Sequence, residues 1–469
     1  MFRAAVLSLV LLLCACAPTS EFHRPTPPVP ENWPSATNPL ELGDAAKTHW
    51  RAFFIDPRLQ TLITSALDYN RDLRIAAGRV EEARALYGIA RADQTPTVNL
   101  LGSSNGTGSV IPGASGQRFD LSLSTVSYEL DFWGRVARLS DAARNSYLAT
   151  EEAKRAVHLS LVADVASAYF TLLQWDELTA LARSTLALRE QSLALIAKGR
   201  DLGGAYDYEY QQASGLLEAS RASLASLEHQ RAVTTNQLNF LVGNAEPTLP
   251  QGWVLDAQGL DVALAPGLPA EVLLLRPDVM AAEQRLAAAH ANIAAARAAF
   301  LPKVLLTAGL GVASQGLASL FNGGAWLFQP VMSLPIFDGG RLAAGVDVAK
   351  ARETIAIAEY EKTIQQAFRE VADQLSARAS WTNQLRAARA NKNAQERRLQ
   401  IAQARYNGGL ISYLEVLDGQ RELVVAQQAF AQIRRSQLDA AAQLYKALGG
   451  GSQSAPTTAK ISAVPDPAT

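Results

Sequence analysis

The sequence predicts a mainly α-helical protein with a small number of membrane β-strands, built from one unit that occurs twice in tandem. Three observations predict this fold class. Identical residues recur at a constant spacing of 206 positions, two helical stretches are far longer than ordinary helices, and short stretches of alternating apolar and polar residues lie before them. Such alternation is typical of strands, and recurrence at a fixed spacing is typical of duplicated architectures.

The duplication is read from residue identities. Adding 206 to a position in the first half lands repeatedly on the same residue type. The matched pairs are Asp72 and Asp278, Ala76 and Ala282, Ala83 and Ala289, Arg91 and Arg297, Pro96 and Pro302, Gly134 and Gly340, Arg135 and Arg341, Trp175 and Trp381, Gly203 and Gly409, Gln237 and Gln443, and Gly243 and Gly449. The spacing holds over roughly 170 residues without a gap, which chance does not produce.

The composition excludes several classes of protein. The 469 residues include 43 basic and 44 acidic side chains, so there is no electrostatic reason to expect a nucleic-acid partner. Cys14 and Cys16 are the only cysteines, and the five histidines are scattered. We therefore expect no disulfide framework, no metal site and no catalytic triad. No apolar run of about 18 residues follows the N-terminus, so no bilayer-spanning helix is expected.

The N-terminus has the pattern of an export signal. Arg3 precedes an apolar segment, Ala4–Leu13, which is too short to span a membrane. The next 22 residues or so (18–39) are rich in proline, which favours an extended tether.

The sequence Leu-Cys-Ala-Cys that ends at Cys16 resembles a lipobox, the acylation site of bacterial lipoproteins. Cys16 is the predicted lipid anchor, because Ala15 before it has the small size that the signal peptidase requires. The alternative site, Cys14, has a leucine before it. A third interpretation is an ordinary signal peptide with incidental cysteines. Ala17, rather than aspartate, follows the predicted anchor, which implies the outer membrane.

Each copy is expected to contain a helix, two strands, a long helix and a last helix. In the first copy a helix over about Arg58–Asp93 precedes strands at about 97–106 and 117–132. The second copy is expected to have strands at about 303–312 and 325–337. These lengths are sufficient to cross an outer membrane.

The long helices are predicted from what they lack. Residues Arg135–Lys198 contain neither glycine nor proline, which predicts a helix of about 64 residues and roughly 96 Å. Residues Arg341–Arg405 contain only Gly345 as an interruption. Such lengths indicate coiled-coil-like packing rather than a globular core. Glycine-containing turns at 199–204 and 407–409 then reverse the chain.

Four strands cannot close a barrel, since closed membrane barrels need at least about eight. An open sheet edge is not viable in lipid, so closure requires oligomerisation. Two subunits would supply eight strands and three would supply twelve, and the residues alone leave both possibilities open.

Several short motifs, in this order and together with the duplication, resemble the TolC/OprM outer-membrane efflux proteins, most closely their lipoprotein branch. The resemblance covers about residues 16–450. It rests on the segments 16–25 (CAPTSEFHRP), 70–73 (NRDL), 129–135 (ELDFWGR), 276–279 (RPDV), 334–341 (LPIFDGGR), 413–418 (YLEVLD) and 444–449 (LYKALG). It implies a trimer in which a twelve-stranded outer-membrane β-barrel, four strands per protomer, is continued by a long periplasmic α-helical barrel.

The chain accordingly divides into six expected parts. These are a signal peptide (1–15), a lipidated proline-rich segment (16–55), the first repeat (56–244), an inter-repeat linker in the equatorial region (245–261), the second repeat (262–450) and a flexible C-terminal tail (451–469).

The resemblance implies a periplasmic gate at Leu414, Glu415 and Asp418. Asp418 lies four positions after Leu414 and three after Glu415, so the three residues share one helix face. Threefold symmetry would place three Asp418 carboxylates around the axis as an ion-sensitive ring, with Leu414 narrowing the pore. The simpler interpretation is a carboxylate near a helix N-terminus, stabilised by the helix dipole.

Two further sets of residues are implied by the resemblance. Glu209, which the duplication pairs with Glu415, and Tyr406 are candidate residues of a latch that holds the gate closed. The alternative is that both are ordinary surface side chains. The candidate adapter-contact tips are the glycine pairs of the two turns, Gly203 with Gly204 and Gly408 with Gly409. Glycine is expected at turns in any case.

The implied function is the exit duct of a tripartite efflux or secretion system, which passively conducts drugs or other small molecules. The implied partners are two further copies of the chain, a periplasmic adapter protein, an inner-membrane transporter driven by protons or by ATP, and outer-membrane lipid. No catalytic residue, metal or cofactor is expected besides the covalent lipid on Cys16, since no P-loop or convergent catalytic motif occurs. The alternatives are a structural periplasm-spanning coiled-coil lipoprotein without transport activity and a lipoprotein enzyme.

Overall fold

A computed structural model describes residues 22–30, 32–34, 48–107, 116–203, 206–243, 249–260 and 272–451. The chain forms two compact units, and each draws on both halves of the sequence. The sheet unit contains residues 1–27, 76–153 and 280–363. The helical unit contains residues 28–75, 154–279 and 364–469. The predicted signal peptide, Cys14, Cys16 and nearly all of the C-terminal tail lie outside the described residues.

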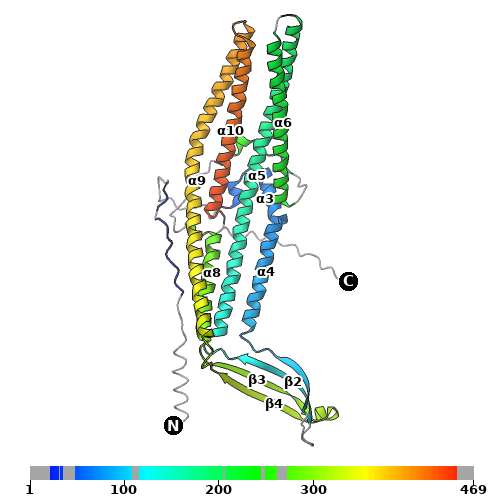
Figure 1. The fold of residues 1–469 in the computed structure, drawn as a ribbon, viewed down its shortest axis with the longest axis vertical. Coiled ribbons are helices and arrows are strands. Elements are labelled where there is room, and N and C mark those ends of the chain that lie inside the picture. Colours follow the sequence, from blue (N-terminus) through cyan, green and yellow to red (C-terminus); the bar gives the residue numbers. More distant parts are fainter. Residues whose placement is uncertain are drawn as a thin grey trace. The chain divides into compact units, whose positions relative to one another are not determined.

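Both halves of the chain show the same order of elements, which is helix, strand, strand, long helix, helix (Figure 1). In the first half these are α4 (Arg71–Ala92), β1 (Asn99–Thr107), β2 (Gly116–Glu129), α5 (Arg135–Asp201) and α6 (Asp207–Val242). In the second half they are α8 (Pro277–Ala298), β3 (Lys303–Ser314), β4 (Gly324–Ser333), α9 (Arg341–Asn407) and α10 (Tyr413–Ala447). The shorter elements are α2 (Trp50–Phe53), α3 (Pro57–Tyr69) and the 3-10 turns η1 (Leu255–Ala257) and η2 (Leu317–Asn322).

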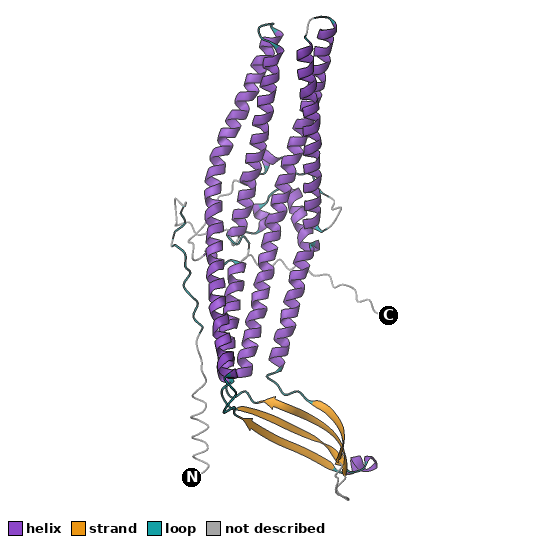
Figure 2. Cartoon of the chain, viewed as in Figure 1, coloured by secondary structure: helices purple, strands orange, loops and turns teal. Residues whose placement is uncertain are grey.

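The strands, drawn in orange in Figure 2, form one antiparallel sheet. The four strands of this sheet lie in the order β1-β2-β3-β4. The central pairing of β2 with β3 joins the two halves of the duplication. In the described residues β1 and β4 each pair on one side only, so they are the two edges of the sheet. Strand β4 ends at Ser333, earlier than the sequence predicts, and Pro335 has no N–H with which to extend the ladder.

The two faces of the sheet differ in chemistry. Leu100, Leu123, Leu310 and Trp326 are direct cross-strand partners and form an apolar row across all four strands. Their exposed fractions are 69%, 58%, 72% and 77%. The next row on the opposite face contains Leu101, Ser122, Gly311 and Ala325. A Cβ on Gly311 would lie 2.3 Å from the Leu121 carbonyl oxygen, so this row requires a residue without a side chain.

Polar contacts fix the junctions between strands and long helices in the sheet unit. The Asp338 carboxylate accepts the backbone N–H groups of Leu342 (2.8 Å) and Gly340 (3.0 Å) at the start of α9. These bonds, the Leu342 bond first, lower the pKa of Asp338. At the corresponding junction before α5, the Trp133 indole donates to the Pro302 carbonyl at 2.7 Å. Trp133 therefore anchors the junction before α5 to the residue that precedes β3, while Asp338 caps the start of α9.

Helices α5 and α9 each contain 67 residues, which corresponds to about 100 Å. Both extend slightly past their predicted ends. By length and composition α5 could cross a membrane, since an 18-residue window of this helix has a mean hydropathy of 1.5. From the sequence alone we expect no such helix, because no long apolar run follows the N-terminus. However, 61% of that window is buried inside the protein. Tyr169 and Phe170 of α5 are fully buried, as in the core of a helical bundle.

The prediction of one helix over Arg58–Asp93 is wrong, because α3 and α4 are separate helices. Asn70 between them has an extended backbone with φ −61° and ψ 134°. Its side-chain amide donates to the Leu241 carbonyl (2.8 Å), and its oxygen accepts the Leu73 N–H (3.0 Å). The side chain thus caps α4 while it binds the end of α6, and these two bonds favour the break over a continuous helix.

A buried carboxylate organises the middle of the helical unit. Asp56 is 1% exposed and begins α3 by accepting the Arg58 N–H at 2.8 Å. It also accepts the Tyr169 hydroxyl (2.7 Å), the Gln258 amide (2.8 Å) and the Trp253 N–H (3.1 Å). Burial and the bond to Asp56 raise the pKa of Tyr169, so its hydroxyl remains a donor. One side chain therefore holds α3, α5 and the segment between the repeats together.

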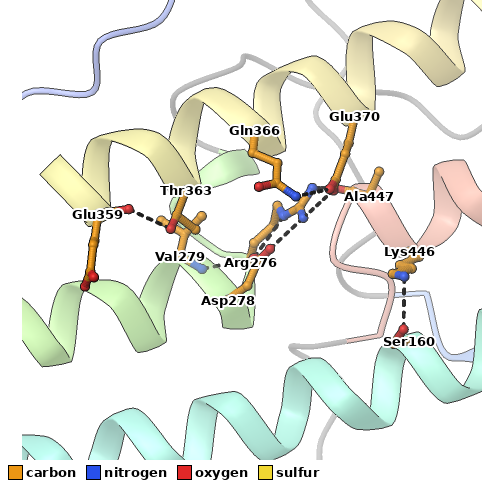
Figure 3. Close-up of polar contacts among 10 residues, drawn as sticks. All are labelled: Ser160, Arg276, Asp278, Val279, Glu359, Thr363, Gln366, Glu370, Lys446 and Ala447. Carbon is orange, nitrogen blue, oxygen red and sulfur yellow. Dashed lines mark hydrogen bonds and ion pairs between the residues drawn. The ribbon is translucent and has the colours of Figure 1, made fainter.

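A buried arginine also holds several helices together, at the C-terminal end of α10. Arg276 is 5% exposed and donates to Asp278 (2.7 and 3.0 Å), Glu370 (2.8 Å) and the Ala447 carbonyl (2.9 Å) (Figure 3). Burial alone would lower the pKa of Arg276, but Asp278 and Glu370 together raise it. The guanidinium thus stays charged and joins α8, α9 and α10.

We expect Asp56→Ala to destabilise the protein by about 3 kcal/mol, because it leaves several buried donors without an acceptor. The apparent thermal midpoint, measured by circular dichroism in detergent, should fall by several degrees. Asp68→Ala is the matched control, since Asp68 is an exposed carboxylate on the same helix. Equal midpoints for the two variants would contradict the role assigned to Asp56.

Candidate functional site

Two helical hairpins of the helical unit end in tight turns. The first turn joins α5 to α6, and the second joins α9 to α10. Gly203 has φ +71° and Gly409 has φ +73°, a backbone conformation that favours glycine. Leu202 and Leu410 beside them are 86% and 72% exposed. Each turn therefore exposes a leucine side chain next to a glycine. Gly204 lies outside the described residues.

The predicted gate residues lie at the start of α10, immediately after the second turn. Leu414 is 50% exposed, and Glu415 in the first turn of the helix is also exposed. Asp418 lies one turn further along the helix and is partly exposed. The structure thus places the three side chains together on the first two turns of α10.

Two arginines neutralise Asp418. Arg398 of α9 donates to one carboxylate oxygen and Arg421 of α10 donates to the other, each at 2.8 Å. The side chains of this triad are 39–64% exposed, so the ion pairs are individually weak and can be exchanged. Within one chain the Asp418 carboxylate is therefore paired with two guanidinium groups, and the three-carboxylate ring of the trimer stays a prediction.

Neither arginine was predicted from the sequence as a partner of Asp418. The spacing of three residues between Asp418 and Arg421 is a usable indication, because such residues are neighbours on a helix. Arg398 lies on another helix, and nothing in the sequence indicates that it meets Asp418.

The gate residues line a hollow of about 550 Å³ within the helical unit. Helices α5, α6, α9 and α10 and the second turn all contribute to its wall. The lining residues are Arg189, Gln212, Leu216, Arg398, Ile401, Ala402, Arg405, Ile411, Leu414, Glu415, Leu417, Asp418 and Arg421. The hollow combines an apolar surface with several charged groups.

Arg189 of α5 is a second feature that the sequence did not indicate. It is 5% exposed and donates to the Gln420 side-chain oxygen at 3.1 Å. Burial lowers the pKa of Arg189, and the nearby Tyr413 partly opposes this effect. The guanidinium is thus a buried cation that is held by a neutral amide.

The candidate latch residues each have a local partner. Glu209 accepts the Tyr206 N–H at 3.3 Å and so caps the start of α6. The ring of Tyr406 lies 5.1 Å from that of Tyr413, whose hydroxyl is hydrogen-bonded to Ser192. Among the described contacts of the single chain, none joins Glu209 to Tyr406, so the latch stays a prediction.

No cluster of three or more histidine, cysteine, aspartate or glutamate side chains suited to a metal ion occurs in the described part of the chain. The site consists of the second turn, the adjoining helix ends and partly exposed ion pairs, all of which surround the hollow.

Comparison with known proteins identifies the family. The sequence profile of the outer membrane efflux protein family matches residues 62–244 and again residues 268–450. The chain belongs to this family. The two matches confirm the tandem duplication that was read from the residue identities.

Relatives of this efflux protein cover nearly its whole length. The probable efflux pump outer membrane protein SepC of Pseudomonas putida is 42% identical over 95% of this chain and 96% of its own. The cation efflux system protein CusC of Escherichia coli is 40% identical over 94% of this chain and 98% of its own.

Solved structures show the same fold. The open state of the Neisseria gonorrhoeae MtrE outer membrane channel has a TM-score of 0.87 at 36% identity, and the match covers 93% of this chain and 98% of that one. A crystal structure of CusC has a TM-score of 0.84 at 39% identity, with 93% and 100% covered.

The predicted fold class is thereby confirmed, and the efflux protein is an exit duct of the outer membrane that extends into the periplasm. The described strands also argue against the alternative of a purely helical bridging lipoprotein, because such a protein has no use for an exposed apolar sheet.

Proposed function

We propose that three copies of this efflux protein close their sheets into one twelve-stranded barrel and form a passive duct. The observation that carries the proposal is the exposed apolar row from Leu100 to Trp326 on a sheet with two unpaired edges. In lipid, each unpaired backbone group costs several kcal/mol. Pairing β1 of one copy with β4 of the next removes both edges. The apolar row then faces lipid, and the row with Ser122 and Gly311 faces the lumen.

The duct closes at the start of α10 in this proposal. Three copies of Leu414 narrow the lumen, and three Asp418–arginine clusters surround it. Because the ion pairs are partly exposed, rearranging them costs little. The gate can therefore open when the helical hairpins move, without unfolding any element.

The proposed partners follow from the exposed turns. The backbone at Gly203, Gly408 and Gly409 and the flanking leucines form a contact surface for a periplasmic adapter; Gly204, which is also a candidate contact, lies outside the described residues. An inner-membrane transporter supplies the energy and selects the cargo. The relatives include proteins named for cation efflux and for toluene efflux at similar identity, so small molecules of several kinds are candidates for the cargo.

The lipid anchor is proposed to be Cys16. Cys16→Ala should abolish metabolic labelling with palmitate, because it removes the acylated sulfur. Cys14→Ala is the control and should leave labelling intact. The opposite result would assign the anchor to Cys14.

The barrel proposal predicts a stable trimer and no stable membrane-inserted monomer, because an isolated sheet leaves its edges unpaired in lipid. Native mass spectrometry of the detergent-extracted protein should show three protomers. A predominant monomer that conducts ions would be incompatible with the proposal.

The gate proposal is tested with the double variant Leu414→Ala, Asp418→Ala. It removes three apolar plugs and three carboxylates, and it leaves Arg398 without its carboxylate and Arg421 with Glu422 alone. In planar bilayers we expect a several-fold higher conductance, weaker selectivity for cations and weaker block by divalent cations.

Asp93→Ala is the control for the gate variant, because Asp93 lies at the end of a different helix and should leave conductance unchanged. If the double variant forms trimers with unaltered conductance and cation block, Asp418 is a structural residue of α10 and the gate lies elsewhere.

A further inference from the structure

The hollow at the start of α10 has two kinds of wall. Its apolar side chains are Leu216, Ile401, Ile411, Leu414 and Leu417. Its basic side chains are Arg189, Arg398, Arg405 and Arg421. A volume of about 550 Å³ is within the range of small-molecule sites. The combination of an apolar surface with a few convergent charged groups is typical of such sites.

The charges of the hollow do not balance. Four guanidinium groups face two carboxylates, those of Glu415 and Asp418. Asp418 is already engaged by Arg398 and Arg421, and Arg421 also pairs with Glu422 at 3.1 Å. Among the described residues, no carboxylate lies within ion-pair distance of either Arg189 or Arg405. The hollow thus carries a surplus of positive charge that this chain does not neutralise.

Arg189 makes this surplus costly. It is nine-tenths or more buried, and its partner, Gln420, is a neutral amide. A buried cation without an anionic partner is unfavourable, because the protein interior replaces the lost hydration poorly. An anion in the hollow would supply the missing charge and strong charge-assisted hydrogen bonds.

We propose that this hollow binds an amphipathic organic anion. A carboxylate or sulfonate headgroup contacts Arg189 and Arg405, and the apolar body lies against Leu216 and Ile401. The binding site goes beyond the exit-duct function and does not depend on the gate. If the gate proposal is also correct, a bound anion competes with Asp418 for Arg398 and Arg421 and weakens the closed constriction.

Binding is tested with naphthalene-2-sulfonate, which has a planar apolar body and one fixed negative charge. Isothermal titration calorimetry on the full-length protein in a neutral detergent should show one site per protomer. The neutral analogue 2-naphthalenemethanol and the cation 2-naphthylmethylammonium distinguish charge recognition from general partitioning into apolar surface. Neither analogue should bind with comparable affinity.

Arg189→Gln and Arg405→Gln should each weaken binding about tenfold or more, the effect of losing a charged hydrogen bond. Arg386→Gln is the matched control, because Arg386 is an exposed arginine of α9 outside the hollow, and its affinity should not change. Circular dichroism and the oligomeric state establish that each variant is folded. Arg405 is exposed, so its variant remains informative even if Arg189→Gln does not fold.

Three results would overturn the proposal. The first is that the unmodified protein does not bind naphthalene-2-sulfonate, which is the result expected if a neighbouring subunit fills the hollow. The second is equal binding of the neutral analogue. The third is unchanged affinity in the folded arginine variants.

Discussion

The edges of β1 and β4, which have no partner strand within the described part of the chain, impose the constraint on which the rest of the molecule depends. A four-stranded sheet that exposes an apolar row from Leu100 to Trp326 belongs in lipid, and lipid tolerates no open edge. The sheet must therefore pair with its own copies. The Trp133 indole ties the junction before α5 to Pro302 beside β3, and Asp338 caps the start of α9.

In the helical unit, two buried charged side chains hold several elements together. Asp56 and Arg276 each gather three elements around one charge that is fully hydrogen-bonded. The ion pairs around Asp418 are different, because they are half-exposed and involve side chains that can exchange partners. The contacts of Asp56 and Arg276 are therefore buried, whereas those of Asp418 lie near the second hairpin turn and are exposed enough to rearrange.

The sequence predicted what depends on periodicity and identity. The spacing of 206 revealed the duplication, alternation located the strands, and the absence of glycine and proline predicted α5 and α9. It did not predict what depends on tertiary contacts. Asn70 interrupts a helix because it meets the end of α6, and Arg398 meets Asp418 only across two helices. Arg189 looks like any helical arginine until its burial is known.

The charged hollow has a consequence for how the two copies have diverged. At the spacing of 206 residues, the counterpart of Asp418 is Gln212, that of Arg398 is Ser192, that of Arg421 is Gly215 and that of Arg189 is Gln395. Each of these four charges thus occurs in one copy and is neutral in the other, whereas Glu415 keeps its charge in its counterpart, Glu209. A single-copy ancestor would repeat each charge in every hairpin of its ring, and like charges would crowd one another. Covalent linkage of the copies breaks that symmetry, so Asp418, Arg398 and Arg421 occur only in the second hairpin and Arg189 only in the first.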